Sequence, residues 1–251
     1  AVVARKTLGE LGFNAAAVES RILGKETPAD AARRAKTAGL GRLDEVIAKS
    51  LARLVEAQRG DGAFGWWPGA QVPDLWMTAY VAWGLELARA SGVALPEQMA
   101  ERIHASIRRF RPRGNESSDC AAWVLAALAA APLDESAAKW LREGFVGCFA
   151  EREKLSAIGR ACLPLAAAKL GTPEERAVVL RNLENGAMRA ESTDLGDTVH
   201  WGATSGYWRA SEGAVENTAL TLLALLELEP KHELIEPAMN WLVLNRRSGR
   251  W

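Results

Sequence analysis

The sequence predicts an all-α fold. Ala and Leu dominate the apolar residues, and aromatic residues other than the 10 Trp are few, with 5 Phe and 2 Tyr. This balance favours helices over strands. In many segments apolar residues recur at intervals of three and four, as on one face of a helix. Helices that are apolar all round also alternate with amphipathic ones, and the first apolar helices start about forty residues apart. A period of that size is typical of stacked helical hairpins.

The helices are expected in chain order from their patterns and boundaries. Residues 1–12 are predicted to be helical up to Gly12, and Thr27-Pro28-Ala29-Asp30 has the form of a helix start with Pro at the first position. Pro164 lies inside an apolar helix and is expected to kink it. Amphipathic helices are predicted at 43–58, 96–110, 135–149, 173–185 and 234–245, and apolar ones at 75–91, 118–131, 156–170 and 216–228.

A Gly-rich turn with aromatic residues joins the first two of these helices, beginning at Gln58-Arg-Gly-Asp-Gly-Ala-Phe-Gly-Trp-Trp-Pro-Gly. Phe64, Trp66 and Trp67 are costly to leave in water, so we expect the turn to fold back onto the helix ends. Asp74 is placed to cap the helix that follows. Asp61 fits the chemistry of the turn itself.

The alternation of apolar and amphipathic helices indicates an inner and an outer layer. Such layers close into an α/α toroid or stay open as a solenoid. Gln58-Arg-Gly-Asp-Gly-Ala-Phe resembles the Gln-x-x-Asp-Gly-x-Trp turn of triterpene cyclases and related toroids, and Asn245-Arg-Arg-Ser-Gly-Arg-Trp251 is a degenerate second copy. We therefore expect a toroid of about five hairpins, incomplete by about one. An aromatic and Gly-rich insertion at about 191–214, with a short hairpin, is expected over one end of the helices.

Composition excludes several classes of function. Lys+Arg and Asp+Glu are equal at 31 each, so no charge excess points to nucleic acid or to an acidic membrane. No apolar run reaches the roughly 18 residues of a membrane span, and the first residues lack the order of a signal peptide. The chain does not begin with Met, and we interpret it as a fragment of a longer protein. Cys120, Cys148 and Cys162 have no metal or redox spacing and are predicted to be small buried apolar residues.

A series of motifs covers nearly the whole chain. In order they are Val2-Val-Ala-Arg-Lys with Leu8-x-x-Leu-Gly, Gln58-x-x-Asp-Gly-x-Phe-Gly-Trp-Trp, Trp76-Met-Thr-Ala-Tyr-Val, Val199-His-Trp-Gly, Val215-Glu-Asn-Thr-Ala, and Pro237-x-x-Asn-Trp-Leu-Val-x-Asn-Arg-Arg-x-Gly-x-Trp. Together they resemble the thioester-containing domain of bacterial alpha-2-macroglobulins, which are relatives of complement factors.

The resemblance implies one toroid domain fragment over 1–251, from a periplasmic or extracellular protease inhibitor and not an enzyme. In that family a Cys-x-Glu-Gln motif forms an internal thioester, which acylates and traps a protease after bait cleavage. The motif's place is just upstream of Ala1, so the thioester itself is absent from this chain. The implied partners are other domains of the parent chain and the target proteases.

His200 is the candidate catalytic residue. Complement-type members use a His in this part of the domain to attack the thioester and transfer the acyl group, and an imidazole suits such chemistry. The alternative is that His200 orders the aromatic insertion beside Trp201 and Tyr207. Gly147-Cys148-Phe149-Ala150-Glu151 echoes the thioester motif, but Glu151 stands where the motif needs Gln, so we interpret it as structural.

The remaining polar residues are interpreted structurally. His104 and His232 lie on amphipathic helices beside charges and are predicted at the surface. Glu216 and Asn217 are expected to cap the helix that they begin, with a thioester-facing role as the alternative. Tyr80, Trp76 and Trp83 are expected to line the toroid's interior or a packing seam.

Two other function classes compete with this interpretation. A toroid enzyme of the terpene cyclase type needs Asp-rich sites, but Asp194 and Asp197 lack a third neighbouring Asp. A prenyltransferase needs Asp, Cys and His on zinc, and only Asp119-Cys120 approaches that set, with Asp119 more simply a cap. The other class is a pure helical-repeat interaction module. We predict no metal and no cofactor.

Overall fold

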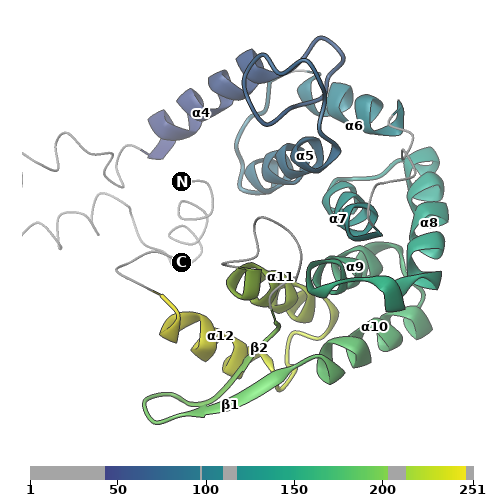
Figure 1. The fold of residues 1–251 in the computed structure, drawn as a ribbon. Helices are drawn as coiled ribbons and strands as arrows, with labels where there is room; N and C mark the ends of the chain where they lie inside the picture. The colour runs from purple at the N-terminus through teal and green to yellow at the C-terminus, as the bar shows by residue number, and fades with distance from the viewer. Residues whose placement is uncertain (1–42, 97, 110–117, 203–212, 247–251) are drawn as a thin grey trace, which may run out of the picture. The chain divides into compact units, whose positions relative to one another are not determined.

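A computed structural model describes residues 43–96, 98–109, 118–202 and 213–246 (Figure 1). The chain divides into two compact units, 1–110 and 111–251, which are described separately below. The described residues are mostly helical, and their only sheet is a two-stranded hairpin, so the all-α prediction is confirmed. The helices predicted near the N-terminus, Tyr207, and most of the second copy of the turn lie outside the described residues. One domain over 1–251 stays a prediction.

The first unit contains α4 (Leu43–Ala57), α5 (Leu75–Ala90) and α6 (Met99–Arg109). The bounds of α4 and α5 agree with the prediction within one residue. Helix α6 begins three residues later than predicted, because Gln98 takes a left-handed φ of 61°, which a continuing α-helix does not allow. The amphipathic pattern of α4 buries Ile47, which packs with Ala88 and Val93.

The second unit contains two layers of helices. The apolar helices of the sequence pattern form one layer, in which α9 packs between α7 and α11 (Figure 1). The amphipathic helices form the other layer: α8 packs on α7 and α9, α10 packs on α9, and α12 packs on α11. The prediction of apolar helices inside and amphipathic helices outside is thus confirmed for this unit. The bounds are α7 Ser118–Ala129, α8 Glu135–Ala150, α9 Ala157–Leu170, α10 Pro173–Asn185, α11 Gly213–Leu228 and α12 Ile235–Leu244, with a short 3₁₀ turn at Arg152–Lys154.

The boundaries of these helices follow local chemistry. Thr172 begins α10 with a capping box, since its side chain accepts from the Glu175 amide while Glu175 accepts from the amide of Thr172. Helix α9 continues through Pro164, which is buried. Helix α11 starts at Gly213, three residues before the predicted start. Glu216 and Asn217 therefore lie inside the helix, and the prediction that they cap it is wrong.

A short antiparallel hairpin precedes α11, as predicted for the insertion. Strand β1 (Met188–Ser192) pairs with β2 (Gly196–His200), and the first strand begins three residues before the predicted insertion. Gly196 has a φ of +71°, which favours glycine at the turn. Strand β2 lies against α12, with Val199 wholly buried in the core. The hairpin thereby packs against the helices α11 and α12.

His232 contradicts the prediction that it lies at the surface. The residue is buried, its Nε2 lies 2.9 Å from Glu184 Oε1, and its Nδ1 accepts from the Leu234 amide at 3.2 Å. These contacts join the end of α10 to the start of α12. His104 is half-buried on α6, and burial lowers its pKa. A helical pattern of charges indicates which face of a helix is exposed. It does not show which histidine is buried with hydrogen-bond partners.

Candidate functional site

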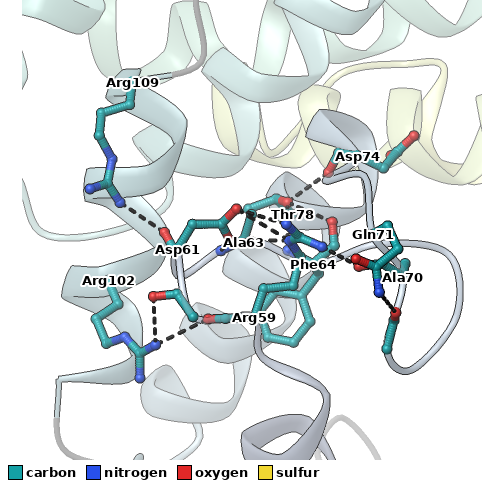
Figure 2. A network of polar contacts seen from close by, with 12 residues as sticks. Arg59, Asp61, Ala63, Phe64, Ala70, Gln71, Asp74, Thr78, Arg102 and Arg109 are labelled. Atoms are coloured by element: carbon teal, nitrogen blue, oxygen red, sulfur yellow. Dashed lines mark hydrogen bonds and ion pairs between the residues drawn. The ribbon is translucent and has the colours of Figure 1, made fainter.

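The aromatic turn after α4 is held by a network of polar contacts around Arg59 and Asp61 (Figure 2). The Arg59 guanidinium donates to both carboxylate oxygens of Asp61 at 3.1–3.2 Å and to the carbonyl of Ala70. Asp61 Oδ1 also accepts from the Ala63 amide at 3.1 Å. The hydrogen bonds from Arg59 are the main reason that the pKa of Asp61 is lowered. Asp61 is therefore a turn residue, and its carboxylate is already engaged.

Asp74 and Thr78 connect this turn to α5. Asp74 Oδ1 accepts from the Met77 amide at 2.7 Å, which confirms the predicted cap, and Oδ2 accepts from the Trp66 indole at 2.9 Å. The Thr78 hydroxyl accepts from the Phe64 amide at 3.0 Å and donates to the Asp74 carbonyl at 2.6 Å. Both oxygens of Asp74 thus have structural partners. Asp74 and Thr78 thus fix the turn to the start of α5.

Helix α6 holds the other side of the turn through two arginines. Arg102 donates to the Arg59 carbonyl at 3.0 Å and Arg109 to the Asp61 carbonyl at 2.8 Å (Figure 2). Gln58 donates to the Gly62 carbonyl at 3.1 Å. Carbonyl groups of an irregular turn need such hydrogen-bond donors where neighbouring helices shield them from water. The turn therefore joins α4, α5 and α6 into one unit.

The aromatic residues of this region differ in burial. Phe64 is buried and Trp66 half-buried, as predicted, but Trp67 is 77% exposed, so the prediction that it folds back is wrong within this unit. Trp67 follows Trp66, whose indole donates to Asp74, and it precedes Gly69, which has a φ of +76°. Tyr80 is 52% exposed and lies 6.4 Å from the Trp83 ring, centroid to centroid.

His200 lies at the end of β2, where its ring stacks on Trp241 of α12. The ring centroids are 4.7 Å apart and the planes differ by 25°. His200 Nδ1 is buried, and no hydrogen-bond partner for it lies among the residues that the structure describes. The ring is thus held by packing on an indole. The sequence did not indicate Trp241 as the partner of His200. The role of His200 in acyl transfer and its role in ordering the insertion both stay predictions.

The two residues after His200 are tied to the beginning of α11. The Trp201 amide donates to the Thr218 hydroxyl at 3.1 Å, and its indole donates to the Leu183 carbonyl at 2.8 Å. Asn217 donates from Nδ2 to the Gly202 carbonyl at 2.6 Å. Asn217 and Thr218 therefore fix the end of the hairpin instead of the helix start.

The same hydrogen-bond arrangement occurs in both units, and we did not predict it from the sequence. Thr78 on α5 binds the amide of Phe64, and Thr218 on α11 binds the amide of Trp201, and both threonines are wholly buried. Each hydroxyl holds the backbone of an aromatic residue in the preceding irregular segment. A Thr near the start of each of these two mainly apolar helices was the available signal.

Asp119 binds the residue that begins a neighbouring helix. Its carboxylate accepts from the Ser156 amide at 2.9 Å and from the Ser156 hydroxyl at 2.7 Å, just before α9. Gly159 makes room for this contact, since an added Cβ would lie 2.1 Å from Asp119 Oδ1. Asp119 thus acts at the start of α9, which lies against the start of α7.

Cys148 and Cys162 are buried thiols, as predicted, whereas Cys120 is partly exposed. Burial raises the pKa of Cys148 to about 11 and that of Cys162 well above its usual value. Glu151, in the segment that echoes the thioester motif, pairs with Lys154 at 2.8 Å. These features agree with the structural interpretation of that segment.

We predict that Cys148 and Cys162 of the folded chain resist thiol reagents at pH 8. With a pKa of about 11, only about one part in a thousand of Cys148 is thiolate at that pH. Timed alkylation with peptide mapping should label Cys120 first and the other two only after denaturation. A Cys120→Ser variant should leave almost no native reactivity. Fast native labelling at Cys148 would contradict the structure.

Two further properties concern the described residues only. In this part of the chain no group of three or more His, Cys, Asp or Glu side chains is arranged to hold a metal ion. None of the helices in the same ranges has the length and apolarity that crossing a bilayer requires.

Comparison with solved structures relates the fold to bacterial alpha-2-macroglobulins. The chain is similar to native Escherichia coli alpha-2-macroglobulin spanning domain MG7 to the C-terminus, at 20% identity and a TM-score of 0.61, over 95% of this chain and 35% of that one. It is similar to Salmonella alpha-2-macroglobulin reacted with methylamine, at 18% identity and a TM-score of 0.60, over 95% of this chain and 14% of that one. Trypsin-activated E. coli alpha-2-macroglobulin matches 77% of this chain and 13% of that one, at 18% identity and a TM-score of 0.53.

At these identities, the TM-scores of 0.53 to 0.61 show a similar fold and nothing further. The chain spans about a third or less of the length of the proteins that it matches. No family model matches the sequence, and no curated protein matches it.

Proposed function

We propose that the chain is part of a bacterial alpha-2-macroglobulin-like protease inhibitor. The observation that carries the proposal is the fold likeness over 95% of the chain to the E. coli and Salmonella proteins. The ordered motifs of the sequence support it independently, since they resemble the thioester-containing domain of the same family. The fold and the motifs thus both support this class of protein.

Within such a parent the chain is the scaffold of the domain that shields and presents the thioester. It lacks a Cys-x-Glu-Gln sequence, so it carries no thioester of that kind, and we propose a role as a scaffold and not as an enzyme. The full toroid, with 1–251 as one domain, belongs to this proposal. Its partners are the neighbouring domains of the parent chain and, after activation, the trapped protease, in the periplasm or outside the cell.

The braced turns support a role in presentation. Arg59, Asp74 and Thr78 fix the segment before α5, and Thr218 with Asn217 fixes the segment before α11. A shielded acyl group needs rigid surroundings, because small displacements admit water or amines. Each segment, within its own unit, is held at several points by buried or half-buried side chains, which supports such a role.

The experiment that tests the proposal is labelling with radioactive methylamine. The isolated 251-residue chain should incorporate none, because no thioester can form in it. The full-length parent, if it carries the reactive motif, should incorporate label at that motif. Label on the isolated chain, or a parent that neither carries the motif nor binds an activating protease, would refute the proposal.

The role of His200 is tested in the same parent. If His200 acts in acyl transfer, His200→Ala should lower the rate of transfer to glycerol relative to the rate with methylamine by about tenfold or more. A matched Trp241→Ala variant removes the stacking partner of His200 and leaves the imidazole in place. Equal rates in wild type and His200→Ala would exclude the acyl-transfer role of His200 and leave only its role in ordering the aromatic insertion.

A further inference from the structure

Two polar side chains on α11 are enclosed without complete hydrogen bonding. Asn217 is 1% exposed and Thr221 is 0% exposed. Asn217 Oδ1 and Thr221 Oγ1 each have no partner among the residues that the structure describes. Buried polar atoms in folded proteins nearly always have a protein or water partner. Two unpaired atoms on one helix therefore require an explanation.

The position of the Asn217 amide is fixed by its other end. Nδ2 donates to the Gly202 carbonyl at 2.6 Å. Rotating the amide by half a turn would place Oδ1 against that carbonyl oxygen, with two acceptors in contact. Oδ1 is therefore the end that faces away from Gly202, and it needs a donor.

Thr221 lies one helical turn after Asn217, on the same face of α11. Side chains at i and i+4 have Cβ atoms about 5–6 Å apart. Thr221 is also three residues from Thr218, whose hydroxyl is engaged by the Trp201 amide. Asn217 Oδ1 and Thr221 Oγ1 thus lie along one polar stripe on a helix that packs against α9.

We propose that Asn217 Oδ1 and Thr221 Oγ1 bind one ordered water molecule buried beside α11. A water accepts and donates about 2.8 Å from each partner, which suits two atoms that are neighbours on a helix but make no direct bond. The water donates to Oδ1, which is an acceptor only, and exchanges a hydrogen bond with the hydroxyl. An inorganic cation is a poorer occupant, because one amide oxygen and one hydroxyl do not compensate a buried charge. This inference does not depend on the proposed function.

The proposal is tested with two substitutions of Thr221. Thr221→Val removes the hydroxyl and keeps the shape, whereas Thr221→Ser keeps the hydroxyl and removes the methyl. Thr218→Val is the comparison variant for a hydroxyl whose partner belongs to the protein. A high-resolution crystal structure of the wild-type chain should show water density within hydrogen-bond distance of both atoms. The same density should be absent from Thr221→Val and present in Thr221→Ser.

Thermal unfolding provides the second readout. Thr221→Val should unfold at a midpoint about 2–4 °C below wild type, because Asn217 Oδ1 loses its donor. Thr218→Val should show a loss at least as large. A site filled by another part of the chain, a site without density, or a Thr221→Val variant as stable as wild type would each overturn the proposal.

Discussion

Replacing Trp201 by alanine is expected to lower the free energy of unfolding by about 3–5 kcal/mol. Trp201 is 5% exposed and belongs to the core that β2, α10, α11 and α12 share, with Leu183, Val199 and Leu225. Its indole donates to the Leu183 carbonyl at 2.8 Å, so the substitution leaves both a cavity and an unpaired carbonyl. Urea denaturation followed by helical circular dichroism measures the change.

Two controls separate packing from hydrogen bonding for this tryptophan. Trp201→Phe fills part of the cavity and loses the indole donor, and we expect it to cost less than the alanine variant. Trp67→Ala removes a side chain that is 77% exposed, so its effect should stay within about 0.5 kcal/mol. Equal losses at Trp201 and Trp67 would show that the core is not where the structure places it.

Gly62→Ala is expected to destabilise the first unit by roughly 2–4 kcal/mol. Gly62 has a φ of +86°, which alanine rarely adopts, and an added Cβ would lie 2.4 Å from the Arg102 carbonyl oxygen. That oxygen is backbone of α6, so it cannot move without moving the helix. Hydrogen exchange of the amides in α5 and α6 shows whether the loss is local to this unit.

Gly69→Ala is the matched control for this prediction. Gly69 has a φ of +76°, and nothing lies within 4 Å of its added Cβ. It therefore reports the backbone cost alone, about 1–2 kcal/mol. The difference between the two variants measures the close approach of α6 to the turn. If both variants lose the same stability, that close approach does not exist in solution.

Helix positions could be predicted well because their causes are local. The apolar periods of α4, α5, α7, α8 and α10 fix their bounds within about two residues of those observed. Asp74 was predicted as a cap from its place before an apolar run, and its carboxylate accepts from the Met77 amide. Caps and periods depend on residues within one or two turns, so neighbouring sequence suffices.

Contacts between distant segments could not be predicted in the same way. Asp119 reaches Ser156, 37 residues away, and His232 reaches Glu184, 48 residues away. Whether a polar side chain is exposed, caps its own helix or binds another depends on which helices pack together. The sequence pattern shows an apolar face but not its partner.

By itself, the sequence determined the all-α class, the alternation of apolar and amphipathic helices and the turn before α5, because each follows from spacing along one segment. The tertiary structure decided which polar residues are buried, that Thr78 and Thr218 hold the aromatic residues before them, and that His200 stacks on Trp241. The physical reason is that a hydrogen bond or a stacked ring needs its partner within a few ångströms. Only the packing of helices brings residues that are far apart in the chain to that distance.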